Sequence, residues 1–241
     1  MNVPSQTHTV QAADLVPERT ATGALVRLLL DSRPSSGLRR QLVELAAGSW
    51  LDGDSGPGGE LWFVVCGRGR ADVAGQPGVL LEPDVGVLVP AGLAYRVRVE
   101  PEDGDGLRLD IVALPGAGRS DPGPALLLAR DLAGCAVEVT GDRQFRVLFG
   151  PGLDCATATQ FVGEIPPGRA PDHSHPYDET VLVLAGHGIL HVNGVTHALA
   201  PGTCTRLPPG LPHCLENTGT SVLRVLGVFH PADSPAAKLT S

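Results

Sequence analysis

The two halves of this 241-residue chain repeat the same series of turn-forming residues at a nearly constant spacing. The spacing is 119 positions at first (179 − 60 for the paired glutamates) and becomes 118 after a one-residue change in one turn. The matched pairs are Glu60 and Glu179, Gly67 and Gly186, Gly75 and Gly194, Pro90 and Pro208, and Gly92 and Gly210. A spacing that is kept over so many turns indicates a duplicated folding unit.

Each half reads as a series of short strands. The chain contains 31 glycines and 22 prolines, residues that end strands and form tight turns. Short apolar runs lie between them, as at 26–30, 60–66, 107–113 and 181–184. Because such runs bounded by turn residues are typical of β-strands, the sequence predicts an all-β fold.

The repeat divides the chain into two predicted domains, residues 1–115 and residues 116–241. Residues 115–125, rich in glycine and proline, are the predicted linker. We expect residues 1–20 to form an arm, because they are polar and show no periodicity. Residues 53–59 hold several glycines and read as a flexible loop. The two short apolar runs that follow the linker could pair with either unit.

Charge, hydrophobicity and cysteine content limit the partners and the cellular compartment that we expect for this protein. The formal net charge is −8 and no run of Lys or Arg occurs, so nucleic acid is not an expected partner. No secretory signal and no 18-residue apolar run are present, so we expect no membrane partner. Five scattered cysteines without a Cys-x-x-Cys motif favour reduced thiols and a cytoplasmic protein.

Four possible metal ligands lie close together in the second half: His173, His175, Glu179 and His213. In an extended segment, His173 and His175 point to the same side, and Glu179 keeps the same parity. His213 follows a Pro-Pro-Gly turn that redirects the chain. Three imidazoles and one carboxylate are a typical ligand set for a divalent transition metal.

The spacing of these residues resembles the two motifs of the cupin superfamily. The first motif corresponds here to Gly168, His173, His175, Glu179 and Gly186, and the second to Gly202, Pro208, Gly210, His213 and Asn217. The turn after Gly168 is one residue shorter than is usual in the family, and the second motif matches without a gap. The resemblance implies two tandem small antiparallel β-barrels of the jelly-roll, or double-stranded β-helix, type. It also implies that the three histidines and the glutamate bind one metal, with Asn217 in a structural position.

The first half lacks most of this ligand set. Counting back by the repeat spacing from the four predicted ligands gives Asp54, Gly56, Glu60 and Tyr95. A single carboxylate without imidazoles does not make a tight transition-metal site, so we predict no metal in the first barrel. That barrel is then a scaffold; the alternative is a pocket for an organic ligand, lined by Trp62, Tyr95 or Asp54.

Other side chains near the motif are candidates for catalysis or substrate binding. Gln160 lies on a predicted strand and could face the metal pocket. Tyr177 flanks the ligands and could orient them from behind. Arg169 and Arg206 could meet an anionic substrate, although the sequence does not fix which way Arg206 faces.

The metal could be Fe, Mn, Ni, Cu, Co or Zn, because histidine and carboxylate suit all of them. Four protein ligands leave about two of roughly six coordination positions open for substrate or dioxygen. The resemblance implies a superfamily of dioxygenases, decarboxylases, isomerases, epimerases and binding proteins, and fold and motif do not choose among them.

We expect a metal-dependent oxygenase acting on a small molecule, either a chelating organic acid or a phenolic compound. One alternative is a metal-dependent isomerase, lyase or decarboxylase without redox chemistry. The other is a non-catalytic, metal-containing sensor or small-molecule binding protein. The resemblance also implies assembly as a homodimer.

Overall fold

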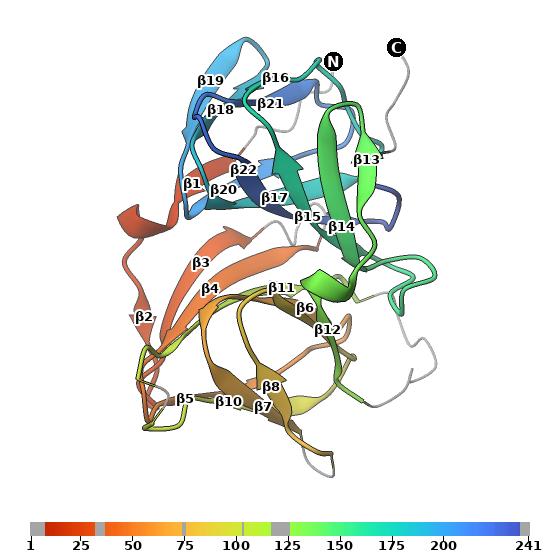
Figure 1. Ribbon diagram of the computed structural model, residues 1–241. Coiled ribbons are helices and arrows are strands. Elements are labelled where there is room, and N and C mark those ends of the chain that lie inside the picture. The colour runs from red at the N-terminus through yellow and green to blue at the C-terminus, as the bar shows by residue number, and fades with distance from the viewer. Residues whose placement is uncertain (1–7, 32–36, 74–75, 103, 117–125, 237–241) are drawn as a thin grey trace. The chain divides into compact units, whose positions relative to one another are not determined.

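The computed structural model describes residues 8–31, 37–73, 76–102, 104–116 and 126–236 (Figure 1). These residues form 22 strands and two short 3-10 turns, η1 (Ala12–Asp14) and η2 (Leu132–Gly134), so the predicted all-β fold is confirmed. In the described ranges, no helix has the length and apolar character needed to cross a membrane. None of the five cysteines, all of which lie in the described ranges, forms a disulfide.

The first of two compact units, Leu15–Gly134, contains a seven-stranded and a four-stranded antiparallel sheet. The larger sheet has the order β12-β9-β6-β11-β4-β3-β2, with β2 (Glu18–Arg19), β3 (Leu25–Asp31), β4 (Arg39–Leu45), β6 (Glu60–Gly67), β9 (Val85–Val89), β11 (Leu107–Ala113) and β12 (Leu128–Asp131). The smaller sheet has the order β5-β10-β7-β8, with β5 (Trp50–Asp54), β7 (Gly69–Val73), β8 (Val79–Leu81) and β10 (Ala94–Arg98).

The second unit, Met1–Asp14 with Cys135–Ser241, repeats this topology strand for strand. Its larger sheet has the order β1-β20-β17-β22-β15-β14-β13, with β1 (His8–Gln11), β13 (Glu138–Thr140), β14 (Arg143–Phe149), β15 (Thr159–Ile165), β17 (Asp178–Ala185), β20 (Thr203–Leu207) and β22 (Leu223–His230). Its smaller sheet has the order β16-β21-β18-β19, with β16 (Gly168–Arg169), β18 (Gly188–Val192), β19 (Val195–Leu199) and β21 (His213–Asn217). The shared strand order agrees with the duplication that the sequence predicts.

Strands β1 and β12 hold equivalent outer places in the two large sheets. β1 pairs with β20, where the hydroxyls of Thr9 and Thr205 are hydrogen-bonded at 2.9 Å. β12 pairs with β9. The start of the chain therefore completes the second unit, and the segment after the linker completes the first. The two units therefore do not coincide with the predicted domains, residues 1–115 and 116–241, because β1 and β12 each belong to the other unit.

Two predicted irregular segments contain strands instead. Part of the predicted arm, residues 1–20, forms the strand β1. A polar sequence suits a strand at the edge of a sheet, where side chains can contact solvent. The predicted loop at 53–59 begins inside β5, which pairs with β10. Of the predicted linker, residues 117–125 lie outside the described part of the chain.

Successive side chains of strand β11 in the first barrel point alternately to the apolar core and to the opposite face of the sheet. Leu109 and Ile111 of β11 enter the apolar core, so Asp110 between them points to the opposite face. There Asp110 receives a forked pair of hydrogen bonds from Arg40, at 2.8 Å from Nε and 3.0 Å from Nη2. Both side chains are fully buried.

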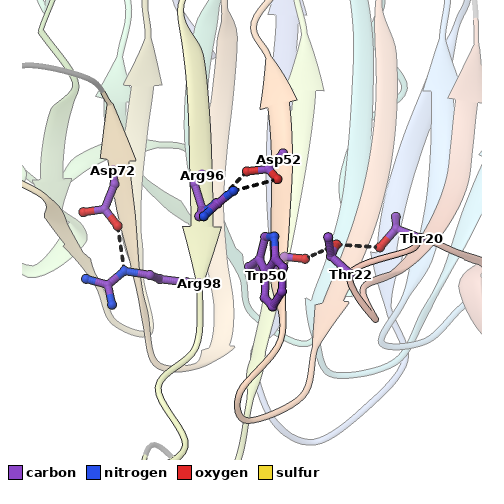
Figure 2. Close-up of polar contacts among 7 residues, drawn as sticks. All are labelled: Thr20, Thr22, Trp50, Asp52, Asp72, Arg96 and Arg98. Carbon is purple, nitrogen blue, oxygen red and sulfur yellow. Dashed lines mark hydrogen bonds and ion pairs between the residues drawn. The ribbon is translucent and has the colours of Figure 1, made fainter.

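A second forked ion pair lies on the exposed face of the smaller sheet. Arg96 of β10 donates to Asp52 of β5 at 2.7 Å from Nε and 3.0 Å from Nη2, and its guanidinium lies over the ring of Trp50 (Figure 2). Asp52 and Arg96 side chains are each 52 % exposed. The two pairs therefore share one geometry and differ in contact with water.

Candidate metal centre

Three histidine side chains converge inside the second barrel. His173 and His175 lie in the segment between β16 and β17, and His213 is the first residue of β21. The backbone N–H of His173 donates to the carbonyl oxygen of His213 at 3.0 Å, and the reverse bond measures 2.9 Å. The ligand atoms of the three imidazoles all lie within 4.8 Å of one another.

A turn that only glycine adopts easily fixes the loop ahead of His213. Gly210 has a φ of +73°, a left-handed conformation that costs glycine little. Its N–H donates to the carbonyl oxygen of His175 at 2.8 Å. The Pro-Pro-Gly turn therefore ties the two motif segments together next to the histidines.

Hydrogen bonds at Nδ1 fix the tautomer of two of the rings. Nδ1 of His213 donates to the carbonyl oxygen of Leu211 at 2.8 Å, and Nδ1 of His173 to that of Pro171 at 3.2 Å. Because a carbonyl oxygen only accepts, the proton lies on Nδ1 and the lone pair on Nε2. Each ring is thus held in the tautomer that binds a metal through Nε2.

Tyr177 supports the third ring from behind. Its hydroxyl lies 3.0 Å from Nδ1 of His175, and the two rings stack with centroids 4.7 Å apart. The other face of the Tyr177 ring stacks on Phe229 at 3.9 Å. Tyr177, predicted as a possible catalytic residue, is buried and is not among the residues that line the cavity. It positions His175 instead.

Glu179, the second residue of β17, adds a carboxylate to the three imidazoles. Its Oε2 lies 3.6 Å from Nε2 of His175. Two neighbouring donor atoms bound to one metal ion lie about 3 Å apart, so these two atoms are near that spacing. Burial, with the nearby charge of Asp178, raises the pKa of Glu179 to about 7. Burial also lowers the pKa of His213 to about 3, so that imidazole is neutral. Three imidazoles, that of His213 neutral, beside a buried carboxylate fit a divalent transition-metal ion.

These donors line a cavity of about 80 Å³. Its polar lining residues are Thr140, Arg143, Gln144, Glu164, His173, His175, Glu179 and His213. Its apolar lining residues are Phe145, Phe161, Gly163, Ile165, Val181, Leu207, Leu215, Val225 and Pro235. A volume of this size holds several water molecules and is suited to a ligand of few heavy atoms.

Two other predicted site residues face away from the cavity. Gln160 precedes Phe161, which lines the cavity, so strand alternation turns Gln160 to the opposite face of β15. Arg206 likewise precedes the lining residue Leu207 and forms a forked ion pair with Asp178, at 2.9 to 3.2 Å. These facings follow from the register of β15 and β20, which the sequence did not fix.

Arg143 lines the cavity although no motif contains it. It is the first residue of β14, two positions before Phe145, which also lines the cavity. The sequence signal that could have identified Arg143 is its place two residues before Phe145, because residues two apart on a strand point to the same face. Arg169, the cation expected near the substrate, is not among the lining residues, and its Nε donates to Sγ of Cys214 at 3.3 Å.

Asn217 has the structural role that its motif position implies. Its Nδ2 donates to the carbonyl oxygens of Ile165 and Ser221, both at 2.8 Å. Its Oδ1 accepts from the N–H of Gly219 at 2.9 Å. Asn217 therefore joins the end of β21 to β15 and to the turn before β22.

Aromatic rings pack at the corresponding place in the first barrel. Glu60 accepts a hydrogen bond from Nε1 of Trp62 at 2.7 Å, and the ring of Trp62 meets Tyr95 edge-on at 4.6 Å. Tyr95 pairs with Gly53, where a Cβ atom would lie 2.4 Å from the tyrosine ring. This packing favours a scaffold over a ligand pocket.

The same register corrects one expected correspondence. His213 pairs with His173, and its counterpart Tyr95 pairs with Gly53. Gly53, rather than Asp54, is therefore the position equivalent to His173. The spacing between equivalent positions is 120 at Gly53 and His173 (173 − 53) and 119 at Glu60 and Glu179 (179 − 60). A constant spacing of 119 therefore gave the residue next to the true equivalent of His173.

Replacing Glu60 with glutamine is expected to leave the metal content of the protein unchanged. Glutamine keeps an oxygen that can accept from Trp62, and residues 15–134, the first unit, contain no histidine. Elemental analysis of both proteins after dialysis tests this. A fall to half the wild-type content would place metal in the first barrel.

Comparison with known families matches residues 161–229 to the family described as "Cupin domain". The comparison with curated proteins finds no match. The matched segment runs from β15 to β22 and includes all four predicted ligands.

Solved structures with the same fold include three bacterial proteins. A deletion mutant of the Bacillus subtilis oxalate decarboxylase OxdC aligns with a TM-score of 0.77 at 14% identity, over 100% of this chain and 80% of that one. The E. coli protein YlbA gives 0.75 at 11% identity, over 97% and 95%. A Pseudomonas aeruginosa protein described as glyoxylate-induced gives 0.76 at 18% identity, over 97% and 92%. Residues 161–229 thus match the cupin domain family, and the chain, which carries a second barrel of the same topology, shares the fold of these structures.

Proposed function

We propose that this protein is a metal-dependent enzyme acting on a small organic acid in its second barrel. The observation that carries the proposal is the convergence of three imidazoles and the Glu179 carboxylate on one small cavity. His173, His175, Glu179 and His213 would hold a divalent transition-metal ion there. Such an ion supplies a Lewis acid and, when redox-active, a site for dioxygen next to the substrate.

The chain itself supplies orientation and exclusion of water. Hydrogen bonds at Nδ1 and the stack on Tyr177 fix the imidazoles, which lowers the cost of organising the site. The apolar side chains around the donors keep the local dielectric constant low, so charges act strongly on a bound substrate. The small cavity favours a compact acid over a bulkier phenolic compound.

An oxygenase is the first candidate for the reaction, and a decarboxylase without net oxidation is the second. The second is supported by the likeness in fold to an oxalate decarboxylase. The two classes differ in their co-substrate, because an oxygenase consumes dioxygen in proportion to turnover. A non-catalytic binding protein would show neither oxygen uptake nor product.

Metal analysis of the purified protein, followed by oxygen-electrode and carbon dioxide measurements with a panel of small acids, tests the proposal. About one Fe, Mn, Ni, Cu or Co per chain with substrate-dependent oxygen uptake supports an oxygenase. Carbon dioxide release without oxygen uptake supports a decarboxylase. A protein that takes up no metal, even after reconstitution, contradicts the proposal. Assembly as a homodimer stays a prediction, which the mass in solution tests.

Replacing Tyr177 with phenylalanine is expected to weaken metal binding by about 10- to 100-fold. The change removes the hydroxyl that contacts Nδ1 of His175 and keeps the ring stack. Competition with a chromophoric chelator measures the affinity. The only other tyrosine, Tyr95, gives a matched control, since Tyr95→Phe alters the first barrel and should leave the affinity unchanged. Equal affinities in all three proteins would contradict the role of Tyr177.

A further inference from the structure

Arg143 extends from the start of β14 across to the smaller sheet of the second barrel. Its Nη2 donates to the carbonyl oxygen of Leu215 on β21 at 3.0 Å. β14 belongs to the larger sheet and β21 to the smaller one, so this bond spans two sheets. The guanidinium is thereby fixed at the wall of the cavity that the three histidines line.

The charge of Arg143 is not neutralised by an ion pair. Among the described residues, no carboxylate lies within ion-pair distance of its guanidinium, although the charge of the adjacent Asp142 acts on it. Other arginines of the second barrel differ: Arg146 on the same strand pairs with Glu164 at 3.4 Å, and Arg206 pairs with Asp178. Arg143 therefore presents free N–H donors at a partly buried position.

The cavity lining therefore holds two kinds of charged or ligating group. The histidines and Glu179 offer metal ligands, and Arg143 offers a cation; the lining carboxylate of Glu164 is paired with Arg146 at 3.4 Å. A divalent metal, Glu179 and Arg143 would leave a net charge of about +2 in a site of low dielectric constant, and the Arg146–Glu164 pair adds no net charge. Such a site selects an anion, and the planar fork of arginine matches a carboxylate.

We propose that Arg143 binds the substrate carboxylate, and that the substrate is a small acid carrying a second oxygen donor for the metal. This inference rests on the proposed function, because the second donor is assigned to the metal. It adds the residue that recognises the acid and the chemical class of the ligand: a carboxylate with a nearby hydroxyl or carbonyl group.

Titration of the Co(II)-loaded protein with glycolate and with its neutral amide, glycolamide, tests the inference. The two probes share the hydroxyl donor and differ in charge. The visible spectrum of Co(II) reports binding, and elemental analysis reports the metal content of every variant. Arg143→Gln is expected to weaken glycolate binding by about 10- to 100-fold and to change glycolamide binding by less than about 2-fold.

Two further variants separate charge from folding. Arg143→Lys keeps the positive charge and should recover part of the glycolate affinity. Arg169→Gln removes a cation from the same barrel that does not line the cavity, and it should bind glycolate like the wild type. Circular dichroism confirms that each variant is folded.

The outcomes distinguish this inference from the proposed function. Unchanged glycolate affinity in Arg143→Gln at full metal content overturns the role of Arg143 and leaves the metal centre intact. Equal losses for glycolate and glycolamide also overturn it, because charge would then not be recognised. A wild-type protein that takes up no metal overturns the proposed function and this inference together.

Discussion

Replacing His213 with alanine is expected to abolish stable metal binding. His213 is buried, lies opposite His173 in the backbone pairing, and offers Nε2 as a neutral donor. The loss of one of three imidazoles should weaken affinity by more than about 100-fold, the upper range for loss of a partner that only orients a ligand. Elemental analysis after dialysis, with circular dichroism as a check of folding, measures the effect.

His191→Ala is the matched control for this experiment. His191 lies on the neighbouring strand β18, but its Nε2 pairs with Glu216 at 2.6 Å and it is not part of the histidine cluster. We expect this variant to keep the wild-type metal content. Near one metal per chain in His213→Ala would mean that the ligand assignment is wrong.

Replacing Asp110 with alanine is expected to destabilise the first barrel by about 3–5 kcal/mol. The change leaves the fully buried guanidinium of Arg40 without its carboxylate. Desolvation of a charge that has lost its partner is the physical cause. Urea denaturation, with fluorescence and circular dichroism compared, measures the free energy of unfolding.

Asp52→Ala is the control, because its pair with Arg96 has the same forked geometry on an exposed sheet (Figure 2). An exposed pair is screened by water and salt and contributes little, so we expect little or no change in unfolding. Similar losses in the two variants would show that burial does not determine the effect.

Much of the fold was predictable because strand and turn signals are local. The apolar runs at 107–113 and 181–184 lie on β11 and β17, and the matched turns recur at equivalent places in both barrels. The three histidines were predictable for a similar reason: their motif spacing reflects a short segment and one turn. Side-chain alternation then brings them to one face.

What the sequence did not reveal depends on pairing between distant segments. The polar residues of β1 carry no alternation signal, and only its ladder with β20 makes them a strand. The facing of Gln160 depends on the register of β15. Arg143 reaches the cavity because β14 and β21 belong to different sheets of one barrel, a closeness that no spacing along the chain encodes.

The places of β1 and β12 determine how the chain could be cut. Truncation to the residues after the predicted linker would remove β1 and leave the outer edge of β20 bare, and a bare edge strand recruits other chains and aggregates. A circular permutation that joins residues 135–241 to residues 1–14 would keep all strands of the second barrel together. A self-sufficient version of the barrel that carries the histidines therefore calls for reordering the gene rather than shortening it.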